Sequence, residues 1–441
     1  MKETKFKQTE VGLIPSDWNV KFLGNLCKNI SSGKNKQRID SGRYAVYGST
    51  GIIGHSDKYY YDGEAILIAR VGANAGFLNK AIGKYDVSDN TLIIEQLRAN
   101  IDFTLEYLKF YNLNKLVFGS GQPLITGGQV KALQIPLPPT IEEQKRIAQA
   151  LSDVDAVITT TEKLIAKKKA LKQGAMQQLL TGKVRLNVQT KDEGRKTKEA
   201  NAVGLLADPL LSREVLAQRA KTRDCHPGAV GDRIQNRFKM TEIGLIPEDW
   251  EVKRLNEICE INPNSMDGLP SKFIYVDLES VSEGKLLSKN VVRKENAPSR
   301  AQRHFQFNDI LYQTVRPYQK NNLYVNFQCS NYIASTGYAV LRSLQGIADS
   351  KYIYHFIHKD DFVNAVLENC TGTSYPAINP NILGKLYIVI PPTIEEQTAI
   401  ATVLSDMDTE IQTLETKLAK YRHLKTGMMQ QLLTGKVRLN K

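Results

Sequence analysis

Parallel loops in the two halves of this chain combine glycines with side chains that suit the base edges and phosphates of a nucleic acid. Arginine can donate two hydrogen bonds to guanine, and asparagine or glutamine can pair in the same way with adenine. Arg70 and Arg316 are the strongest candidates, because each is expected to follow a buried strand into a loop. Any one of these residues could also be an ordinary solvated loop residue. The candidate DNA contacts are Tyr47, Ser49, Arg70, Asn74 and Gln122 in the first half, and Arg316, Gln319, Lys320, Asn322, Ser374 and Tyr375 in the second.

The motifs that would indicate catalysis are incomplete. The segments NPNS (262–265) and NPNI (379–382) lack the second proline and the aromatic residue of an adenine-methyltransferase NPPY motif. The two TGKV segments lack the upstream glycine frame of a phosphate-binding loop. We therefore expect no catalytic residue and no bound cofactor on this chain.

Two further patterns suggest metal chemistry only superficially. Asp277, Glu283 and Lys285 imitate a nuclease motif, but their spacing is short and the first half of the chain has no counterpart. His355 and His358 are expected on one helix face without a third ligand, and a structural zinc site needs four. We expect no metal site.

Composition indicates a multidomain protein with an affinity for polyanions. A chain of 441 residues is expected to form two to four domains. Its formal charge of +13 favours a nucleic acid as partner, although a basic surface kept for solubility would look the same. No apolar run is long enough to cross a bilayer, and the N-terminal residues have no apolar signal region. The five scattered cysteines include no CxxC pair and predict reduced thiols in a cytoplasmic protein.

The chain is a tandem repeat. Thr9–Cys27 matches Thr241–Cys259, Pro138–Ile158 matches Pro391–Ile411, and QQLLTGKVRLN occurs at both 177–187 and 430–440. The middles between the matched ends, residues 28–137 and 260–390, are hardly alike. This pattern indicates two modules that are held identically but contact different things. Cys27 and Cys259 occupy matching positions, which indicates a buried packing site.

Each repeat closes with a predicted long helix. Thr140 followed by Glu143, and Thr393 followed by Glu396, have the spacing of a capping box, and Gly182 and Gly435 supply the stops. About forty residues at 1.5 Å each give a helix of about 60 Å. A narrow heptad stripe favours an intramolecular coiled coil of the two helices, although each helix could instead pack on its own domain. The stripe consists of Ile147, Leu151, Val154, Ile158, Thr161 and Ile165 in the first copy, and Ile400, Leu404, Met407, Ile411, Leu414, Leu418 and Tyr421 in the second.

The middles are predicted to mix helices and strands. AILIARV (65–71) has the pattern of a buried strand, and NDILYQTVRPYQKNN (308–322) takes its place in the second copy. DFTLEYLKFYNLN (102–114) and SKYIYHFIHKDDFVNAVL (350–367) are each predicted to form one helix. Val188–Met240 has the composition of a flexible linker, with a possible short helix at Leu210–Lys221.

The combination of GLIPxDW, a variable region, PP…EEQ, a long helix and LLTGK resembles the specificity subunit of type I restriction–modification systems. The resemblance covers essentially the whole chain except Val188–Met240. It implies an α+β fold in which two mixed α/β target-recognition domains are joined by two long antiparallel coiled-coil helices, as a pseudo-two-fold tandem repeat. The implied parts are recognition domain 1 (1–139), spacer helix 1 (140–187), a linker (188–240), recognition domain 2 (241–392) and spacer helix 2 (393–441).

The same resemblance implies that the chain reads a split site in double-stranded DNA and leaves the chemistry to its partners. Two modification subunits would bind S-adenosylmethionine and methylate adenine, and two restriction subunits would use ATP and magnesium. The complex would be cytoplasmic, with no membrane partner. The linker departs from a compact family pattern and leaves open how the halves are joined. The alternatives are a free-standing sequence-specific DNA-binding regulator and a coiled-coil adaptor for proteins.

Overall fold

The computed structural model describes residues 5–36, 38–118, 123–186, 237–263 and 268–439. The candidate contact Gln122 and the predicted linker helix Leu210–Lys221 lie outside these residues. The chain divides into two compact units. Unit 1 consists of Met1–Leu164 and Leu414–Lys441, and unit 2 consists of Ile165–Thr413. Each unit therefore combines the body of one repeat with the end of the other repeat.

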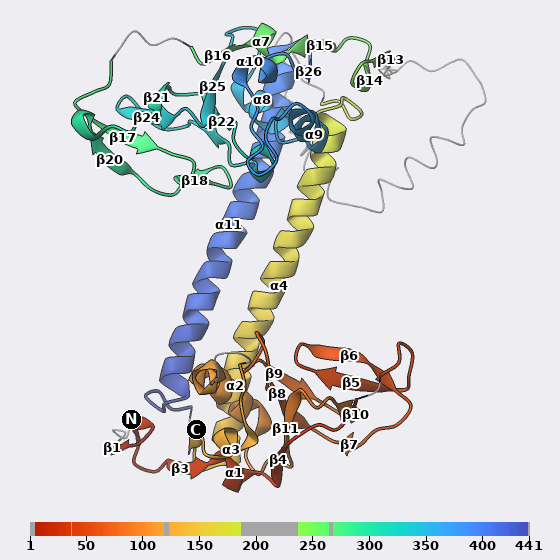
Figure 1. Ribbon diagram of the computed structural model, residues 1–441, viewed down its shortest axis with the longest axis vertical. Coiled ribbons are helices and arrows are strands. Elements are labelled where there is room, and N and C mark those ends of the chain that lie inside the picture. The colour runs from red at the N-terminus through yellow and green to blue at the C-terminus, as the bar shows by residue number, and fades with distance from the viewer. Residues whose placement is uncertain (1–4, 37, 119–122, 187–236, 264–267, 440–441) are drawn as a thin grey trace, which may run out of the picture. The chain divides into compact units, whose positions relative to one another are not determined.

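Unit 1 begins with short strands and closes with part of a long helix (Figure 1). Its elements in chain order are β1 (Phe6–Thr9), β2 (Gly12–Pro15), β3 (Asn19–Phe22), α1 (Leu23–Leu26), β4 (Asn29–Ser32), β5 (Tyr44–Gly48), β6 (Gly51–Ser56), β7 (Tyr61–Asp62), β8 (Ala65–Ala69), β9 (Leu78–Ala81), β10 (Lys84–Val87), β11 (Thr91–Glu95), α2 (Ile101–Tyr111), η1 (Leu113–Leu116), α3 (Gly127–Lys131), β12 (Gln134–Leu137) and α4 (Ile141–Leu179).

An inner sheet of unit 1 lies between a helical layer and an outer sheet. The inner sheet has the order β4-β11-β8-β9 and the outer sheet the order β6-β5-β10-β7. In β8, Ile66 and Ile68 pack with Phe103 of α2, whereas Ala65 and Leu67 pack with the outer sheet. All five residues of β8 are buried, which confirms the buried strand predicted from AILIARV. The apolar run is continuous because both faces of this strand are covered.

Unit 2 repeats this order with other residues. Its elements are β13 (Phe238–Thr241), β14 (Gly244–Pro247), β15 (Glu251–Arg254), α7 (Leu255–Ile258), β16 (Cys259–Ile261), β17 (Lys272–Val276), β18 (Val281–Ser282), β19 (Lys285–Leu286), β20 (Asn290–Arg293), η2 (Lys294–Asn296), β21 (Ala301–His304), β22 (Ile310–Gln313), η3 (Pro317–Gln319), β23 (Leu323–Tyr324), β24 (Tyr332–Ser335), β25 (Tyr338–Ser343), α8 (Ser350–Phe356), α9 (Asp360–Glu368), α10 (Pro380–Leu383), β26 (Tyr387–Ile390) and α11 (Ile394–Leu432).

The dissimilar middles share one topology. The inner sheet of unit 2 has the order β16-β25-β22-β23, and its outer sheet has the order β20-β17-β24-β21. In both outer sheets the two central strands are parallel, β5 with β10 and β17 with β24. The repeat therefore extends through segments in which the sequence shows little of it. Since the buried faces require only apolar residues of suitable size, the sequence could drift while the fold stayed the same.

The repeated segment QQLLTGKVRLN of each repeat packs on the opening motif of the other repeat. In unit 1, Gly435 lies so close to Pro15 and Trp18 that a Cβ at this position would collide with the Pro15 ring. Arg438 pairs with Asp17 at 2.9 Å and with Glu143 at 2.8 Å. The tail of the second repeat thus binds the opening motif of the first repeat.

In unit 2 the first repeat's tail binds the second repeat's opening in the same manner. Gly182 lies against Pro247 and Trp250. Arg185 pairs with Asp249 at 2.9 Å and with Glu396 at 2.7 Å. This exchange explains why both copies retain QQLLTGKVRLN, because each opening motif needs one tail.

The long helices begin almost as the capping pattern predicts, with one difference. The hydroxyl of Thr140 accepts from the backbone N–H of Glu143 at 3.2 Å, and Thr393 caps Glu396 at 3.3 Å. The reciprocal half of the predicted capping box is not formed, because the carboxylates of Glu143 and Glu396 are bonded to the arginines of the tails. The predicted stops are confirmed: Gly182 and Gly435 have φ of 66° and 70°.

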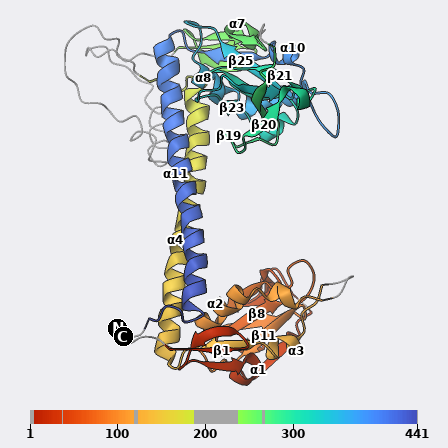
Figure 2. The same cartoon turned by 90° about the vertical axis from the view of Figure 1, so that its left-hand side faces the viewer.

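Within each unit α4 and α11 run antiparallel and side by side (Figures 1 and 2). In unit 1, Lys425 pairs with Asp155, and Arg422 pairs with Glu162 on the next turns. In unit 2, Lys168 pairs with Glu410 at 2.7 Å. The apolar stripe also does more than join two helices: its first members, including Ile147 and Ile400, are fully buried in the cores of their own units. The alternative of packing on the domain therefore holds for the first turns of both helices.

The predicted helix over 350–367 is wrong as a single element. It breaks into α8 and α9, with Lys359 in extended backbone between them. Asp360 and Asp361 then favour a new helix start, because acidic side chains stabilise the first turn. The predicted helix over 102–114 is nearly right, since α2 covers 101–111 and Asn112 ends it in the left-handed conformation. Cys27 and Cys259 are buried, as predicted.

Candidate nucleic-acid interface

One loop leaves the end of the inner strand in each unit, and the two loops superimpose bond by bond. The carbonyl of Arg70 accepts from Ile125 at 2.8 Å, and the carbonyl of Thr314 accepts from Ile378 at 3.0 Å. Gly72 N–H donates to Pro123 at 3.0 Å, and Arg316 N–H donates to Pro376 at 2.7 Å. Arg70 therefore corresponds to Thr314, and Arg316 corresponds to Gly72. The two arginines both follow the inner strand, as predicted, but they occupy different positions of corresponding loops.

The backbone of these loops takes the left-handed conformation at two matching positions. Gly72 and Gly76 have φ of 74° and 92° in unit 1, and Arg316 and Lys320 have φ of 54° and 55° in unit 2. A residue with a side chain costs roughly 1–3 kcal/mol in this region, whereas glycine costs little. Unit 2 therefore places two cations where unit 1 avoids strain with glycine. Backbone strain of this kind is kept where the side chain has a functional or structural role.

Arg316 is stacked on an exposed aromatic ring. Its guanidinium carbon lies 4.3 Å from the ring centroid of Tyr375, and 63% of Tyr375 is exposed. The ring orients the guanidinium and leaves its N–H donors without an acidic partner among the described residues. Ser374, beside Tyr375, is also exposed. Arg316, Ser374 and Tyr375, three of the predicted contacts, are thus brought to one accessible surface.

Lys320, which is partly exposed, and Asn322, which is buried, are instead bonded to other groups of the protein. The Lys320 ammonium donates to Asp360 at 2.7 Å and to the carbonyl of His358 at 3.0 Å. Asn322 is only 3% exposed, and its side-chain oxygen accepts from the backbone of Gln313 at 2.8 Å. The predicted roles as DNA contacts do not fit this burial and pairing. Both residues hold the loop, and their places in a polar stretch gave no sign of it.

Gln319 lies between these two groups. Its side-chain oxygen accepts from Gln313 at 2.9 Å, and the residue itself is exposed. One end of its amide is therefore fixed while the other end faces outward. Tyr318, half exposed on the same short helix η3, is an aromatic neighbour that the sequence pattern did not single out.

In unit 1, Arg70 and Ser49 meet at Asn90. The Asn90 carbonyl accepts from the backbone N–H of Arg70 at 3.0 Å and from the Ser49 hydroxyl at 3.4 Å. The Arg70 Nε is buried and has no hydrogen-bond partner among the described residues. Buried donors without a partner are rare in proteins.

A basic run beside Ser49 is a feature that the sequence predictions missed. Lys36 and Arg38 line the same hollow as Ser49 and Asn90. The alternation of basic and polar residues over 34–38 was the available signal, but no glycine-rich loop surrounds it to draw attention to it. Tyr47, in contrast, packs with Tyr85 in the core between the sheets, with ring centroids 5.6 Å apart.

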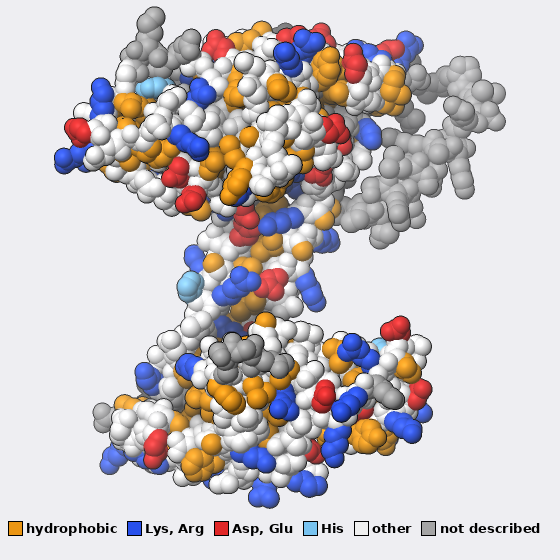
Figure 3. All heavy atoms as spheres, viewed as in Figure 1, with side chains coloured by type: hydrophobic (Ala, Val, Ile, Leu, Met, Phe, Trp, Pro, Cys, Tyr) orange, Lys and Arg blue, Asp and Glu red, His pale blue; other side chains and the backbone are white. Residues whose placement is uncertain are grey.

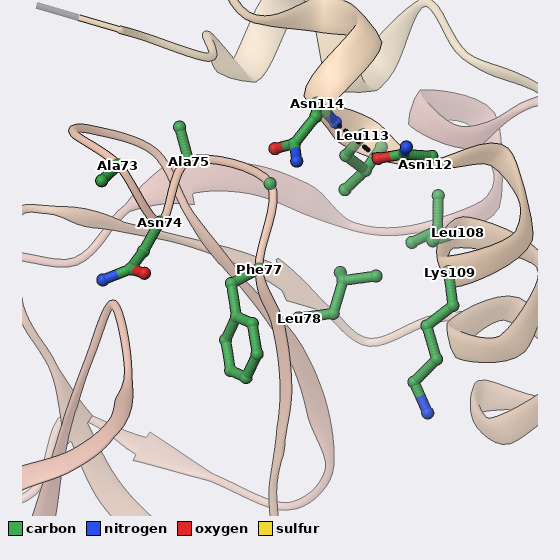
Figure 4. Close-up of a pocket in the computed structure, with 11 residues that line it drawn as sticks. Ala73, Asn74, Ala75, Phe77, Leu78, Leu108, Lys109, Asn112, Leu113 and Asn114 are labelled. Atoms are coloured by element: carbon green, nitrogen blue, oxygen red, sulfur yellow. Dashed lines mark hydrogen bonds between the residues drawn. The ribbon is translucent and has the colours of Figure 1, made fainter. Parts of the chain in front are cut away.

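Asn74 lies on the rim of another hollow of unit 1. Figure 4 shows Asn74 and Phe77 from the loop after β8, with Asn112 and Asn114 from the turn that follows α2. About half of Phe77 is exposed. The amide of Asn74 is thus accessible, as the prediction requires, but it is separate from the group around Asn90.

Desolvation shifts the pKa of histidines that lie close to the unit 2 loop. Among the described residues, no group of three or more His, Cys, Asp or Glu side chains could hold a metal ion. His355 is buried and His358 is partly buried, and desolvation lowers the pKa of both, to about 4 for His358. Over the described ranges, no helix is both long and apolar enough to span a membrane. The accessible groups of these loops are hydrogen-bond donors, cations and aromatic rings, all of which can contact DNA.

Comparisons with known proteins agree with this chemistry. The family model described as "Type I restriction modification DNA specificity domain" matches residues 15–172 and 247–420. The chain is 25% identical to the type I restriction enzyme MjaVIII specificity subunit of Methanocaldococcus jannaschii, over 99% of this chain and 97% of that protein. It is 26% identical to the putative MjaX specificity subunit of the same organism, over 99% of this chain and 98% of the relative.

A solved structure supports the fold. The crystal structure of the type I restriction–modification S subunit from M. genitalium matches with a TM-score of 0.59 and 15% identity, over 97% of this chain and 98% of that chain. At this identity the likeness speaks for the fold alone. Because the family model matches most of both repeats, this chain belongs to the type I restriction–modification DNA specificity family and is a specificity subunit.

Proposed function

We propose that each unit reads one half of a bipartite site in double-stranded DNA through the loop that follows its inner strand. The observation that carries the proposal is the pair of superimposable loops with different residues, Gly72 opposite Arg316 and Arg70 opposite Thr314. Two identical frames with unlike contact groups are what a split, asymmetric site requires. The specificity subunit itself is not the enzyme.

In unit 2 we assign base reading to Arg316, supported by Tyr375, Ser374 and Gln319. Its guanidinium can donate two hydrogen bonds to guanine, and the ring beneath it reduces the rotamer entropy that would be lost on binding. In unit 1 we assign contacts to Arg70, Ser49 and Asn74, with Lys36 and Arg38 on phosphates. Gln122, directly before Pro123, holds the sequence place of Tyr375 and stays a candidate from the sequence alone.

The reaction belongs to partner subunits. Two modification subunits with S-adenosylmethionine would methylate adenine after flipping it out of the duplex, because stacking hides the amino group that they must reach. Two restriction subunits would use ATP and magnesium. The recognition domains (1–139 and 241–392) would direct them, and the helices (140–187 and 393–441) would set the spacing of the half-sites. The family match supports these assignments, and nothing favours a free-standing regulator or a protein adaptor.

Sequencing of methylated adenines in the host genome tests the proposal. Deletion of the gene should remove methylation from one bipartite motif and leave other motifs unchanged. Exchange of residues 28–137 for those of a relative should then alter one half-site only. A continuous motif, or a change in both half-sites after the exchange, would contradict independent reading by the two units. Unchanged methylation after deletion would favour a regulator.

A further inference from the structure

Two cations stand opposite each other on the outer sheet of unit 2. Lys272, the first residue of β17, is the cross-strand partner of Arg293 on β20. Both are exposed, and neither forms an ion pair with an acidic group in the described part of the chain. Like charges that stand directly opposite each other destabilise a sheet. Lys294 follows in the chain and adds a third exposed positive charge.

Unit 1 carries cations at the same place in its own outer sheet. In unit 1, Arg43 lies two residues before Ala45, which pairs with Tyr85 of the parallel neighbour strand. In unit 2, Lys272 lies two residues before Ile274, which pairs with Tyr332 of the parallel neighbour strand. The two cations therefore occupy corresponding positions. Lys84 begins the parallel neighbour β10. The two middles share almost no sequence, yet both place cations where a parallel central strand begins.

In unit 1 these cations form cation–π contacts with tyrosine rings. The Arg43 guanidinium carbon is 5.6 Å from the ring centroid of Tyr44, and the Lys84 ammonium is 4.7 Å from that of Tyr59. Asp62 is the cross-strand partner of Lys84, but the ammonium turns to Tyr59 and forms no ion pair with Asp62. In Figure 3, Lys and Arg side chains gather over the part of unit 1 where Figure 1 labels β5, β7 and β10.

This charged end of the sheet is opposite to the end that holds the reading loops. Ser49 and Asn90 follow the ends of β5 and β10, whereas Arg43 and Lys84 stand at their beginnings. Five strand residues at about 3.3 Å each separate the two ends by roughly 16 Å. That length equals about five base-pair steps along one DNA strand, at roughly 3.4 Å per phosphate.

We propose that the cations at this end of the outer sheet, Arg43 and Lys84 in unit 1 and Lys272 and Arg293 in unit 2, bind phosphates of the duplex beside each half-site. The inference rests on the proposed function, since it takes DNA as the ligand, and adds contacts that hold the duplex without reading it. Phosphate oxygens neutralise the opposed charges of Lys272 and Arg293, so the cost in the free protein is recovered on binding. Lys and Arg are the usual donors to phosphate, and such contacts position a protein without carrying sequence information.

The Lys272→Glu variant separates folding from binding. It replaces a like-charge pair with an opposite-charge pair, so the thermal unfolding temperature of the full chain should stay equal or rise. Affinity should fall equally for a duplex that carries the methylated host site and for a random duplex of the same length. The slope of log K against log salt should become shallower by about 0.9 for each phosphate that the variant no longer binds. Arg293→Glu should behave in the same way, and the pair Arg43→Ala with Lys84→Ala should show the same equal loss of affinity and shallower salt slope.

Lys239→Glu is the matched control. It makes the same charge change in unit 2 on β13, where the Lys239 ammonium donates to the Glu248 carbonyl, and it should leave the salt slope unchanged. An unchanged slope in Lys272→Glu and Arg293→Glu would overturn the proposal, as would a weakening confined to the host-site duplex. If the unmodified chain bound neither duplex in a salt-dependent way, the proposed function itself would fail.

Discussion

Arg438 donates to the carboxylate of Glu143 at 2.8 Å, although 295 residues separate the two in the chain. The Glu143 side chain is 3% exposed, and its hydrogen bond with Arg438 is the main reason why the pKa of Arg438 is raised. The pair joins the start of one long helix to the tail that follows the other. Each repeat is therefore incomplete by itself, and a tail supplied by the other repeat closes its core.

Replacing Arg438 with alanine should destabilise unit 1. The change leaves the buried Glu143 carboxylate without its partner, and breaking a buried pair from one side costs roughly 3–5 kcal/mol. Because Asp17, the other partner, is half exposed, we expect the lower end of this range. Chemical denaturation followed by tryptophan fluorescence measures it, since Trp18 lies beneath the guanidinium, 5.8 Å from ring centroid to guanidinium carbon.

Arg422→Ala is the control for this prediction. Arg422 pairs with Glu162 between the same two helices, but both side chains are largely exposed, so its removal should cost less than about 1 kcal/mol. Arg185→Ala should affect unit 2 as Arg438→Ala affects unit 1. If Arg422→Ala and Arg438→Ala lowered the free energy of unfolding equally, burial of Glu143 would not add to the stability given by its pair with Arg438.

Arg316→Gly should stabilise the protein and weaken its recognition of DNA. Glycine removes the strain of a left-handed backbone, a gain on the order of 1 kcal/mol, and recreates the residue that unit 1 has at this position. Removal of two hydrogen bonds to guanine should cost roughly 1–3 kcal/mol on the cognate half-site. Thermal unfolding and competitive DNA binding measure the two effects separately.

Lys320→Gly provides the comparison. It relieves the same kind of strain, but it also removes the bonds to Asp360 and His358, so it should not raise stability. Its effect on DNA should be indirect and similar for all sequences. If Arg316→Gly weakened binding to random DNA as strongly as to the cognate site, Arg316 would be a phosphate contact and not a base reader.

Lengthening both long helices by one heptad should widen the unread gap between the half-sites. Seven residues add about 10.5 Å at 1.5 Å each, which is close to three base pairs at 3.4 Å. Seven residues also turn a helix through nearly two full turns, so the apolar stripe keeps its face. Methylation mapping in a host with the altered gene reads the gap directly. An unchanged gap would show that the helices do not set it, and insertion in α4 alone is the control that should impair folding.

The sequence was informative where a pattern repeats and uninformative where a contact is made at a distance. Helix starts at Thr140 and Thr393 and the buried strand 65–69 follow from local chemistry, and all are found. The pairing of Glu143 with Arg438 could not be predicted, because the capping pattern offers that carboxylate a nearer partner. Asn74 and Asn322 were both candidate contacts because an asparagine amide can pair with adenine, and only the fold distinguishes the buried amide of Asn322 from the exposed one of Asn74.

Acidification should destabilise unit 2 through His358. The ring is desolvated by its neighbours and neutral: Nδ1 donates to the Tyr354 carbonyl at 2.6 Å, and Nε2 accepts from Asn322 at 3.3 Å. Desolvation is the main reason why its pKa is lowered to about 4, below the ordinary value of about 6.5. Between these two pH values the unfolded chain therefore binds more protons than the folded chain. The contribution of neutral His358 to stability is fully present above about pH 6.5 and is lost as the pH falls toward 4. The loss of stability is on the order of 3 kcal/mol.

Urea unfolding at pH 7 and at pH 4.5 measures this loss. His358→Gln should reduce the difference in stability between the two pH values, while His423→Gln, on α11, should leave that difference unchanged. If His358→Gln showed the same pH dependence as the unmodified protein, other groups would cause the acid destabilisation, and buried His355 would be the first candidate.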